Sequence, residues 1–421
     1  MWSLRSLLSR PQPLLLSRLL PGRPHASQLT AVLGTSNLIG LRGYASNPDG
    51  DSQRRDEANR QDATGKRHLY VVLDDHEDGF SIHKLDLGEH HDLLHDVAHR
   101  LPEPPVLRVT HTSRAIRRRR QQHRGVLIYD TKTAAITVAP HLPDSLTDGV
   151  GYKAALAVGD RLYILDSVGH WKGGGLHCLT TDPCSCGHEF WRWRRLSRSS
   201  RWCWSFWSDY EYDDLPVQPF LAKHITAYAS HERYEILVSM RPTKTSVTGA
   251  IFTFSRMRSR WTQRRHWHLP IVGQAHYDGH LGAWVGLHAV SVGEDMYAPP
   301  VADGHLCVGN VMSHPKEWKA GKEKLFRFDE DATAGWSHVQ AKIVPMVSAK
   351  GCTEYCLMEH LRPKGNDEEC LTEGDEWLLR LTSFHVERGE DGEPVAMAHR
   401  PARSYKVSRY NKGFDAQVFW L

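Results

Sequence analysis

Three histidines in one short segment could bind a metal ion. His91, His95 and His99 recur every four residues, so on a helix their imidazole rings would share a face and could hold zinc or copper. Asp92 and Asp96 lie beside them. The segment has no cysteine and no HExxH order, and histidine is common along the whole chain. We therefore interpret these residues as surface histidines and expect no metal ion or other cofactor.

A second cluster mixes thiols with imidazoles, which are the ligands that zinc prefers. Its spacing, Cys-x-Cys-x-His, is not a common zinc pattern, and paired Cys-x-x-Cys knuckles are absent. A turn containing proline and glycine that joins two outer strands explains the segment more simply. The residues concerned are His177, Cys178, Cys184, Cys186 and His188.

Asp74, His76 and Asp78 imitate the start of a calcium-binding loop. Leu85 stands at the twelfth position, where such a loop needs glutamate. The segment is therefore expected to be a hairpin turn.

Arginine and tryptophan alternate in residues 191–207, WRWRRLSRSSRWCWSFW. Arginines neutralise phosphates and tryptophans stack on unpaired bases, so such a tract can bind single-stranded RNA. Alternatively, the tryptophans pack between sheets and the tract joins two strands. The loop 201–219, which overlaps the end of this tract, is rich in the side chains that anchor protein interfaces. Its candidates for an interaction surface are Trp202, Trp204, Trp207, Tyr210 and Tyr212.

Signatures of catalysis are missing from the sequence. We find no GxSxG elbow, no P-loop, no GxGxxG after a strand and no HExxH. The chain is therefore not expected to be an enzyme. A metal-dependent enzyme using one of the clusters above is the less favoured alternative.

The N-terminal residues have the composition of an organelle-targeting peptide. Residues 1–48 contain no Asp, Glu or Lys, and arginines are spread among leucines and serines. Arg42 lies at the third position before a cleavage point between Tyr44 and Ala45, as matrix processing requires. We expect a disordered mitochondrial transit peptide over residues 1–44 and a matrix location. A plastid or dual address and a plain disordered N-terminus are the alternatives.

Removing that peptide changes the meaning of the net charge. The chain is formally +4, and residues 1–44 contribute five arginines, so 4 − 5 leaves −1. A near-neutral body argues against nucleic acid as the main partner. No stretch reaches the roughly 18 apolar residues of a membrane span, and irregularly spaced cysteines suit reduced thiols.

The rest of the chain is expected to be all-β. Residues 45–66 have no apolar side chain larger than alanine and proline and are expected to form a polar, disordered linker. From residue 67 to 421, apolar runs end in acidic or small polar turns, and Trp193, Trp261 and Trp336 recur at equivalent places. Two inner strands followed by two outer strands, repeated about five to six times, are typical of a kelch-like β-propeller. A pair of β-sandwiches is the alternative.

Several segments of the body, in this order, carry a resemblance to a known family. They include RHLYVVLDD, HITAYASHERYEILVSM, IFTFSRMRSRWTQRRHWHLP, GHLCVGNV, CTEYCLME and LLRLTSFHVE. With them the body resembles a plant family, expanded in grasses, that is filed under a domain of unknown function of the 1618 type, close to kelch-like and F-box-associated propellers. The resemblance covers nearly all of residues 67–421 and implies only the fold and a plant setting, because the family has no established activity.

One segment departs from that family. Residues 112–125, TSRAIRRRRQQHRG, stand where relatives have a hydrophobic hairpin. So many arginines cannot form inner strands, because burying unpaired guanidinium groups is prohibitive. We expect a disordered loop and an incomplete second blade, or a gene model that has lost an exon.

Two functions from different classes remain. The favoured one is a non-catalytic, protein-binding propeller in the mitochondrion. The alternative is RNA binding by the tract at residues 191–207. No small-molecule ligand can be identified from the sequence.

Overall fold

The computed structural model describes the strands and most of their connections. Every element in this part of the chain is a strand, apart from the 3-10 helices η6 (Ala222–His224) and η7 (Pro315–Glu317), which confirms the all-β class. No helix in this part is long and apolar enough to cross a membrane. The described residues are 14–16, 29–33, 37–41, 68–74, 80–86, 98–109, 126–130, 134–143, 146, 152–158, 161–166, 175–183, 189–198, 215–231, 235–243, 247–255, 257–290, 300–311, 313–326, 335–347, 353–364, 376–398, 402–408 and 417–420.

The middle of the chain forms two sheets. The first has four antiparallel strands in chain order, namely β10 (Tyr152–Val158), β11 (Arg161–Asp166), β12 (Gly175–Pro183) and β13 (Glu189–Arg198). The second has eight strands and consists of two antiparallel runs joined by parallel pairing of β14 with β18. Its strands are β14 (Ile225–His231), β15 (Glu235–Met240), β16 (Ala250–Ser255), β17 (Arg260–Arg265), β18 (Ile271–Asp278), β19 (Ala283–Val290), β20 (Val301–Gly309) and β21 (Lys319–Lys324).

The C-terminal part forms a third sheet and completes a fourth. The third has the order β22-β23-β24-β26-β6, with β25 also paired to β24. In the fourth, the last strand, β27, pairs with β4, the first strand after the expected linker. The strands are β22 (Trp336–Val347), β23 (Thr353–Pro363), β24 (Glu376–Arg388), β25 (Pro394–Ala398), β26 (Arg403–Ser408), β6 (His99–Arg100), β27 (Gln417–Trp420), β4 (His68–Asp74), β5 (Phe80–Asp86) and β7 (Leu107–Val109).

The β4–β5 hairpin follows the sequence prediction. Asp74 pairs with Phe80 across it, so the two strands that flank the segment imitating a calcium loop pair as a hairpin, as expected. Residues 75–79 themselves lie outside the described residues.

The fifth sheet contains strands that the sequence analysis did not expect. Its order is β3-β2-β1-β8-β9, and Leu14 in β1 lies beside Val126 in β8. Part of the segment expected to be a disordered transit peptide therefore forms strands, because its runs LLL, LTAVL and NLIGL are apolar enough to pair. The bounds are β1 (Leu14–Leu16), β2 (Leu29–Leu33), β3 (Asn37–Leu41), β8 (Val126–Asp130) and β9 (Ala135–Ala139).

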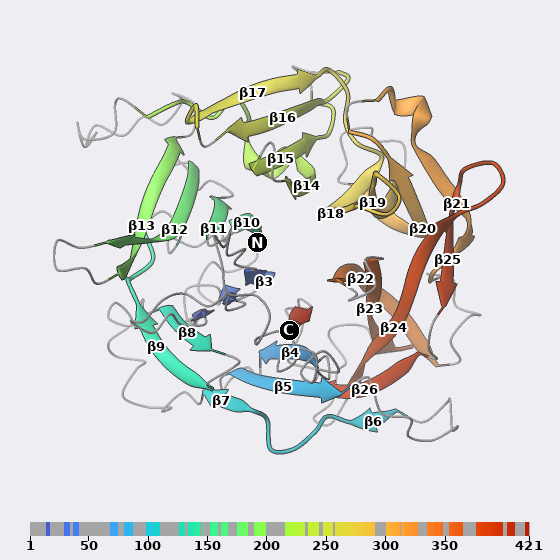
Figure 1. Ribbon diagram of the computed structural model, residues 1–421. Coiled ribbons are helices and arrows are strands. Elements are labelled where there is room, and N and C mark those ends of the chain that lie inside the picture. The colour runs from blue at the N-terminus through green and yellow to red at the C-terminus, as the bar shows by residue number, and fades with distance from the viewer. Residues whose placement is uncertain are drawn as a thin grey trace, which may run out of the picture.

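The sheets surround a common centre (Figure 1). Strands β10, β14, β18 and β22 lie on the inner side of their sheets, toward that centre, whereas β13, β17 and β21 lie at the periphery. Each sheet thus runs from the inside of the molecule to the outside. Residues far apart in sequence meet where the faces of neighbouring sheets pack together.

Apolar side chains from facing sheets form the core. One cluster joins β10–β13 to β14–β17 and includes Tyr163, Leu176 and Phe254. Another joins β18–β21 to β22–β25 and includes Val285, Tyr355 and Phe384. Successive side chains of a strand point to opposite faces of the sheet, so β23 contributes Tyr355 and Leu357 to one cluster and Cys356 and Met358 to another.

Candidate functional site

Most candidates from the sequence lie outside the described residues. This holds for the cleavage residues Arg42, Tyr44 and Ala45 and for the arginine-rich segment expected at 112–125. It also holds for the interaction candidates Trp202, Trp204, Trp207, Tyr210 and Tyr212. These expectations therefore remain predictions.

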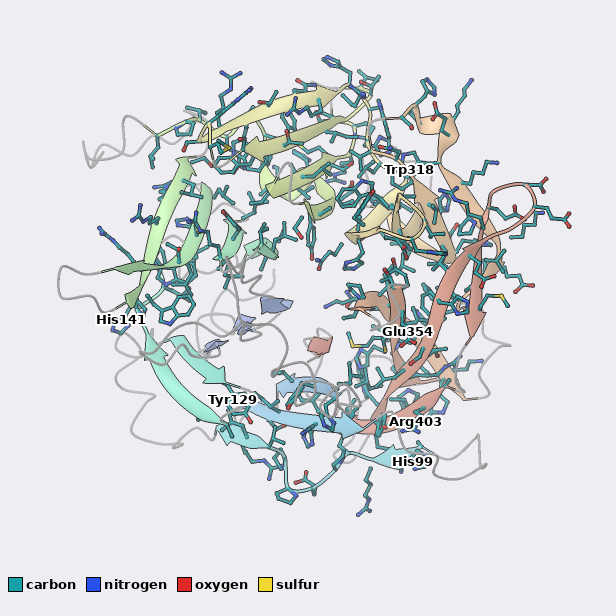
Figure 2. The ribbon with its side chains drawn as sticks, in the orientation of Figure 1. His99, Tyr129, His141, Trp318, Glu354 and Arg403 are labelled. Carbon is teal, nitrogen blue, oxygen red and sulfur yellow. The ribbon has the colours of Figure 1, made fainter. Side chains whose placement is uncertain are left out.

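The metal-ligand candidates are only partly described. His99 is exposed on β6 at the rim of the molecule (Figure 2), while His91 and His95 lie outside the described residues. His177 and Cys178 are both buried on β12. As neighbours on a strand they face opposite sides. Within the described ranges, no group of three or more metal-ligating side chains occurs.

The tryptophans fix outer strands to neighbouring elements. Trp193 on β13 donates from Nε1 to the carbonyl of Pro140, 3.3 Å away, just after β9. Trp261 on β17 is buried, and its Nε1 donates to Ser197 Oγ on β13 at 3.2 Å. Its ring meets Phe220 edge-on, with 4.8 Å between centroids. For these two residues, packing between sheets is the correct reading of the tryptophan pattern.

A buried ionic cluster lies on the third sheet. Glu359 on β23 pairs in register with Arg380 on β24, and Arg380 Nε lies 3.1 Å from Glu359 Oε2. His338 Nε2, on β22, lies 3.9 Å from Glu359 Oε1. The His338 ring stacks on Phe326, which follows β21, with 4.4 Å between centroids and 2° between planes. The cluster therefore ties β22–β24 to the sheet beside it.

Burial controls the ionisation of this cluster. It raises the pKa of Glu359 to about 7, although Arg380 nearby favours the charged form. Burial lowers the pKa of His338 to about 4, and the positive charge of Arg380 acts in the same direction. The Glu359 carboxyl is only 3 % exposed. A group that transfers protons must reach its substrate, so this arrangement fits a structural contact better than a catalytic one.

Sequence reasoning missed the cluster. The available signal was the pair Glu359-His360 inside the apolar run of CTEYCLMEHL. A charged residue there requires a buried partner, but its partner, Arg380, lies on the next strand of the hairpin.

Two further buried contacts join the same sheets. Tyr355 donates its hydroxyl to Asp278 Oδ2 at 3.0 Å. His276 Nε2 lies 3.1 Å from the carbonyl of Ile343, and burial lowers the pKa of His276 to about 4, so its neutral ring donates there. The strands joined are β18, β22 and β23.

The outer strand β21 contacts an acidic hairpin through two of its lysines. Lys322 Nζ lies 2.8 Å from Asp391 Oδ2 and 2.8 Å from Glu393 Oε1, in the β24–β25 hairpin. Lys319 donates to the Asp391 carbonyl. A Cβ atom on Gly321 would stand 2.7 Å from the Pro394 carbonyl oxygen. The hairpin therefore lies directly against the strand.

The outer strand β17 is also basic but belongs to an acid-free segment. Residues 236–277 contain no Asp or Glu and carry Arg241, Lys244, Arg256, Arg258, Arg260, Arg264 and Arg265. Residues 257–260, at the tip of the β16–β17 hairpin, are exposed, and Met257 is 93 % exposed. In the described part of the chain β17 pairs with one strand, β16. This strand and its hairpin tip form the candidate interaction surface.

Comparisons with known proteins give a family but no activity. No curated protein matches the chain. Among solved structures, "Crystal structure of the tricorn protease" is similar at 8% identity and a TM-score of 0.24, covering 93% of this chain and 45% of that one. The chain thus spans less than half the length of that protein, and so weak a likeness carries no argument. The 1618-type and kelch-like assignments are not confirmed. A family profile described as "Protein of unknown function (DUF1668)" matches residues 66–405, and the chain belongs to that family.

Proposed function

We propose that residues 67–421 form a kelch-like β-propeller that acts as a non-catalytic protein-interaction module. The arrangement of the sheets around a common centre supports a propeller (Figure 1). So does the pairing of the last strand, β27, with β4, which joins the two ends of this region in one sheet. We infer that this pairing makes the frame of sheets rigid, because it ties the last strand of the region to the first.

The interaction role rests on one observation: buried ionisable side chains contact neighbouring strands, whereas basic side chains of the outer strand β17 are exposed. The buried ionisable residues Glu359, Asp278 and His276 contact neighbouring strands. The outer strand β17 instead carries exposed arginines in an acid-free segment. Arginine is enriched at protein interfaces and anchors them. A rigid frame with a basic periphery fits a binding protein.

Proximity labelling in cells tests this role. The full chain fused to a labelling enzyme should recover the same protein partners in repeated experiments. A matched control carries the labelling enzyme with residues 1–50 alone, so that it samples the same compartment. Failure to enrich any partner over this control would overturn the interaction role.

We also propose that residues 1–44 direct the protein to the mitochondrion. The acid-free, arginine-containing composition supports this address. A fluorescent fusion of residues 1–50 should enter mitochondria, and N-terminal sequencing of the mature protein should begin at Ala45. Cytosolic fluorescence would contradict the address. A mature chain that retains Leu14–Leu41 would show instead that β1–β3 stay in the folded protein.

A further inference from the structure

We propose that β17 and the tip of the β16–β17 hairpin bind an acidic segment of a partner protein. This inference rests on the proposed interaction function and names the chemistry of its partner. The surface consists of Met257, Arg258, Arg260 and Arg264.

Local charge is the first argument. The segment 236–277 has seven basic residues and no acid, whereas the chain as a whole is nearly balanced, with 53 Lys and Arg against 49 Asp and Glu. This part of the chain therefore carries a local excess of positive charge. A concentration of one sign attracts a segment of the opposite sign and sets its orientation.

The position of the arginines is the second argument. Trp261 is buried and bonded to Ser197, so β17 is held firmly against the adjacent sheet. Arg258, Arg260 and Arg264 are exposed on either side of this anchor. Basic groups on a fixed strand lose less conformational freedom on binding than groups on a loose loop. Met257, at 93 % exposure, adds an apolar contact at the hairpin tip.

The strand β21 shows how an outer strand of this molecule contacts an acidic segment. On β21, Lys322 contacts Asp391 and Glu393 from an acidic hairpin that lies against the strand. The hairpin combines a close backbone approach at Gly321 with charge pairing. A partner segment with the same composition would meet β17 in the same way.

The aromatic residues favour protein over RNA at this surface. Binding of single-stranded RNA combines arginines with aromatic rings that stack on bases. On strands β16 and β17, the aromatic residues Phe252, Phe254 and Trp261 are all buried. An acidic peptide needs only the charges and the edge of the strand. The observations therefore favour an acidic protein segment.

Binding of defined probes to the purified full chain tests the proposal. The probes are a fluorescent peptide of repeated Glu-Asp-Gly units and a poly-uridine RNA of similar length. The wild type should bind the peptide, and binding should weaken as salt rises, because exposed charges are screened. The double variant R258E/R260E should bind the peptide about tenfold or more weakly.

A control variant separates this surface from net charge. K223E/K316E makes the same change in charge at two other exposed lysines, on η6 and η7, and should bind the peptide like the wild type. Circular dichroism should show that both variants are folded.

Three results would overturn the proposal. They are no peptide binding at low salt, equal binding by R258E/R260E and the wild type, or a preference for the RNA that R258E/R260E abolishes. Proximity labelling separates this failure from that of the proposed function. If R258E/R260E keeps every partner of the wild type in cells, the interaction role stands and this surface is wrong.

Discussion

Strands β17 and β21 occupy corresponding outer positions in the two runs of one sheet, but the surroundings of their basic side chains differ. On β21, Lys322 pairs with Asp391 and Glu393 of the acidic β24–β25 hairpin. β17 lies in a segment without a single acid and ends a run that pairs only through β16 in the described residues. The strand β21 shows that a basic outer strand of this protein can bind an acidic segment. On β21 that contact is internal, and on β17 we infer that it is made with another molecule.

Removing the anchor of β17 should have the largest effect. Trp261→Ala deletes a buried ring that contacts Phe220 and Phe254 and should lower the free energy of unfolding by about 3–5 kcal/mol. Chemical denaturation measures the change. Trp261→Phe keeps the ring contacts and loses the bond to Ser197, so it should cost only about 1 kcal/mol. Equal losses in both variants would show that packing contributes little there.

The close packing just before β21 gives the next effect. A Cβ atom on Gly309 would stand 2.3 Å from Trp318 Cδ2, so Gly309→Ala should cost about 1–3 kcal/mol through overpacking. Thermal unfolding measures it. The matched control is Gly279→Ala, where nothing lies within 4 Å of the added atom. A loss of stability in the control alone would contradict this account of β21.

The sheet that supplies the acidic hairpin should show a pH effect. Burial raises the pKa of Glu359 from 4.5 to about 7. As pH rises, Glu359 therefore ionises in the unfolded chain before it ionises in the folded one. Its contribution to the free energy of unfolding is fully present below pH 4.5 and is lost as pH rises to about 7. Relative to Glu359→Gln, the wild type should become less stable over this range, as measured by urea unfolding at several pH values. A difference that is independent of pH would contradict the raised pKa.

Buried histidines act in the opposite direction. Burial lowers the pKa of His338 and His276 to about 4 and that of His177 and His360 to about 3. Their contribution to the free energy of unfolding is fully present above pH 6.5, their ordinary pKa, and is lost as pH falls. Because these four residues outnumber Glu359, the protein itself should lose stability below about pH 6.

Removing the contact between Asp391 and Lys322 on β21 should give the smallest change in stability. Asp391 and Lys322 are both largely exposed, so Asp391→Ala should leave the unfolding midpoint nearly unchanged. The same variant should instead speed hydrogen exchange in the β24–β25 hairpin, because one of its contacts to β21 is gone. Unchanged exchange would show that Lys322 does not hold the hairpin in place.

Local features of the fold could be predicted from the sequence, and distant pairings could not. The β4–β5 and β16–β17 hairpins follow from alternating apolar residues around polar turns. The pairing of β14 with β18 and of β27 with β4 joins residues without a shared local pattern. The strands β1–β3 were missed because arginine content indicated a targeting peptide, while their apolar runs can also pair.

The candidate site shows the same limit. The basic composition of β17 was visible in the sequence, but it acquires meaning only when Trp261 is placed against Ser197 and the strand is found at the periphery. The acidic contact of β21 comes from residues about seventy positions away in the sequence, Asp391 among them. Glu359 could be suspected as a charge within an apolar strand, but Arg380 and His338 are brought to it by two hairpins.

Hydrogen exchange of the full chain, with and without the Glu-Asp-Gly peptide, tests the central claim most directly. The account predicts that the peptide slows exchange in residues 257–268 and leaves β21 and the β24–β25 hairpin unchanged, because Lys322 on β21 already pairs with Asp391 and Glu393. Protection located elsewhere in the chain, or none at saturating peptide, would contradict it.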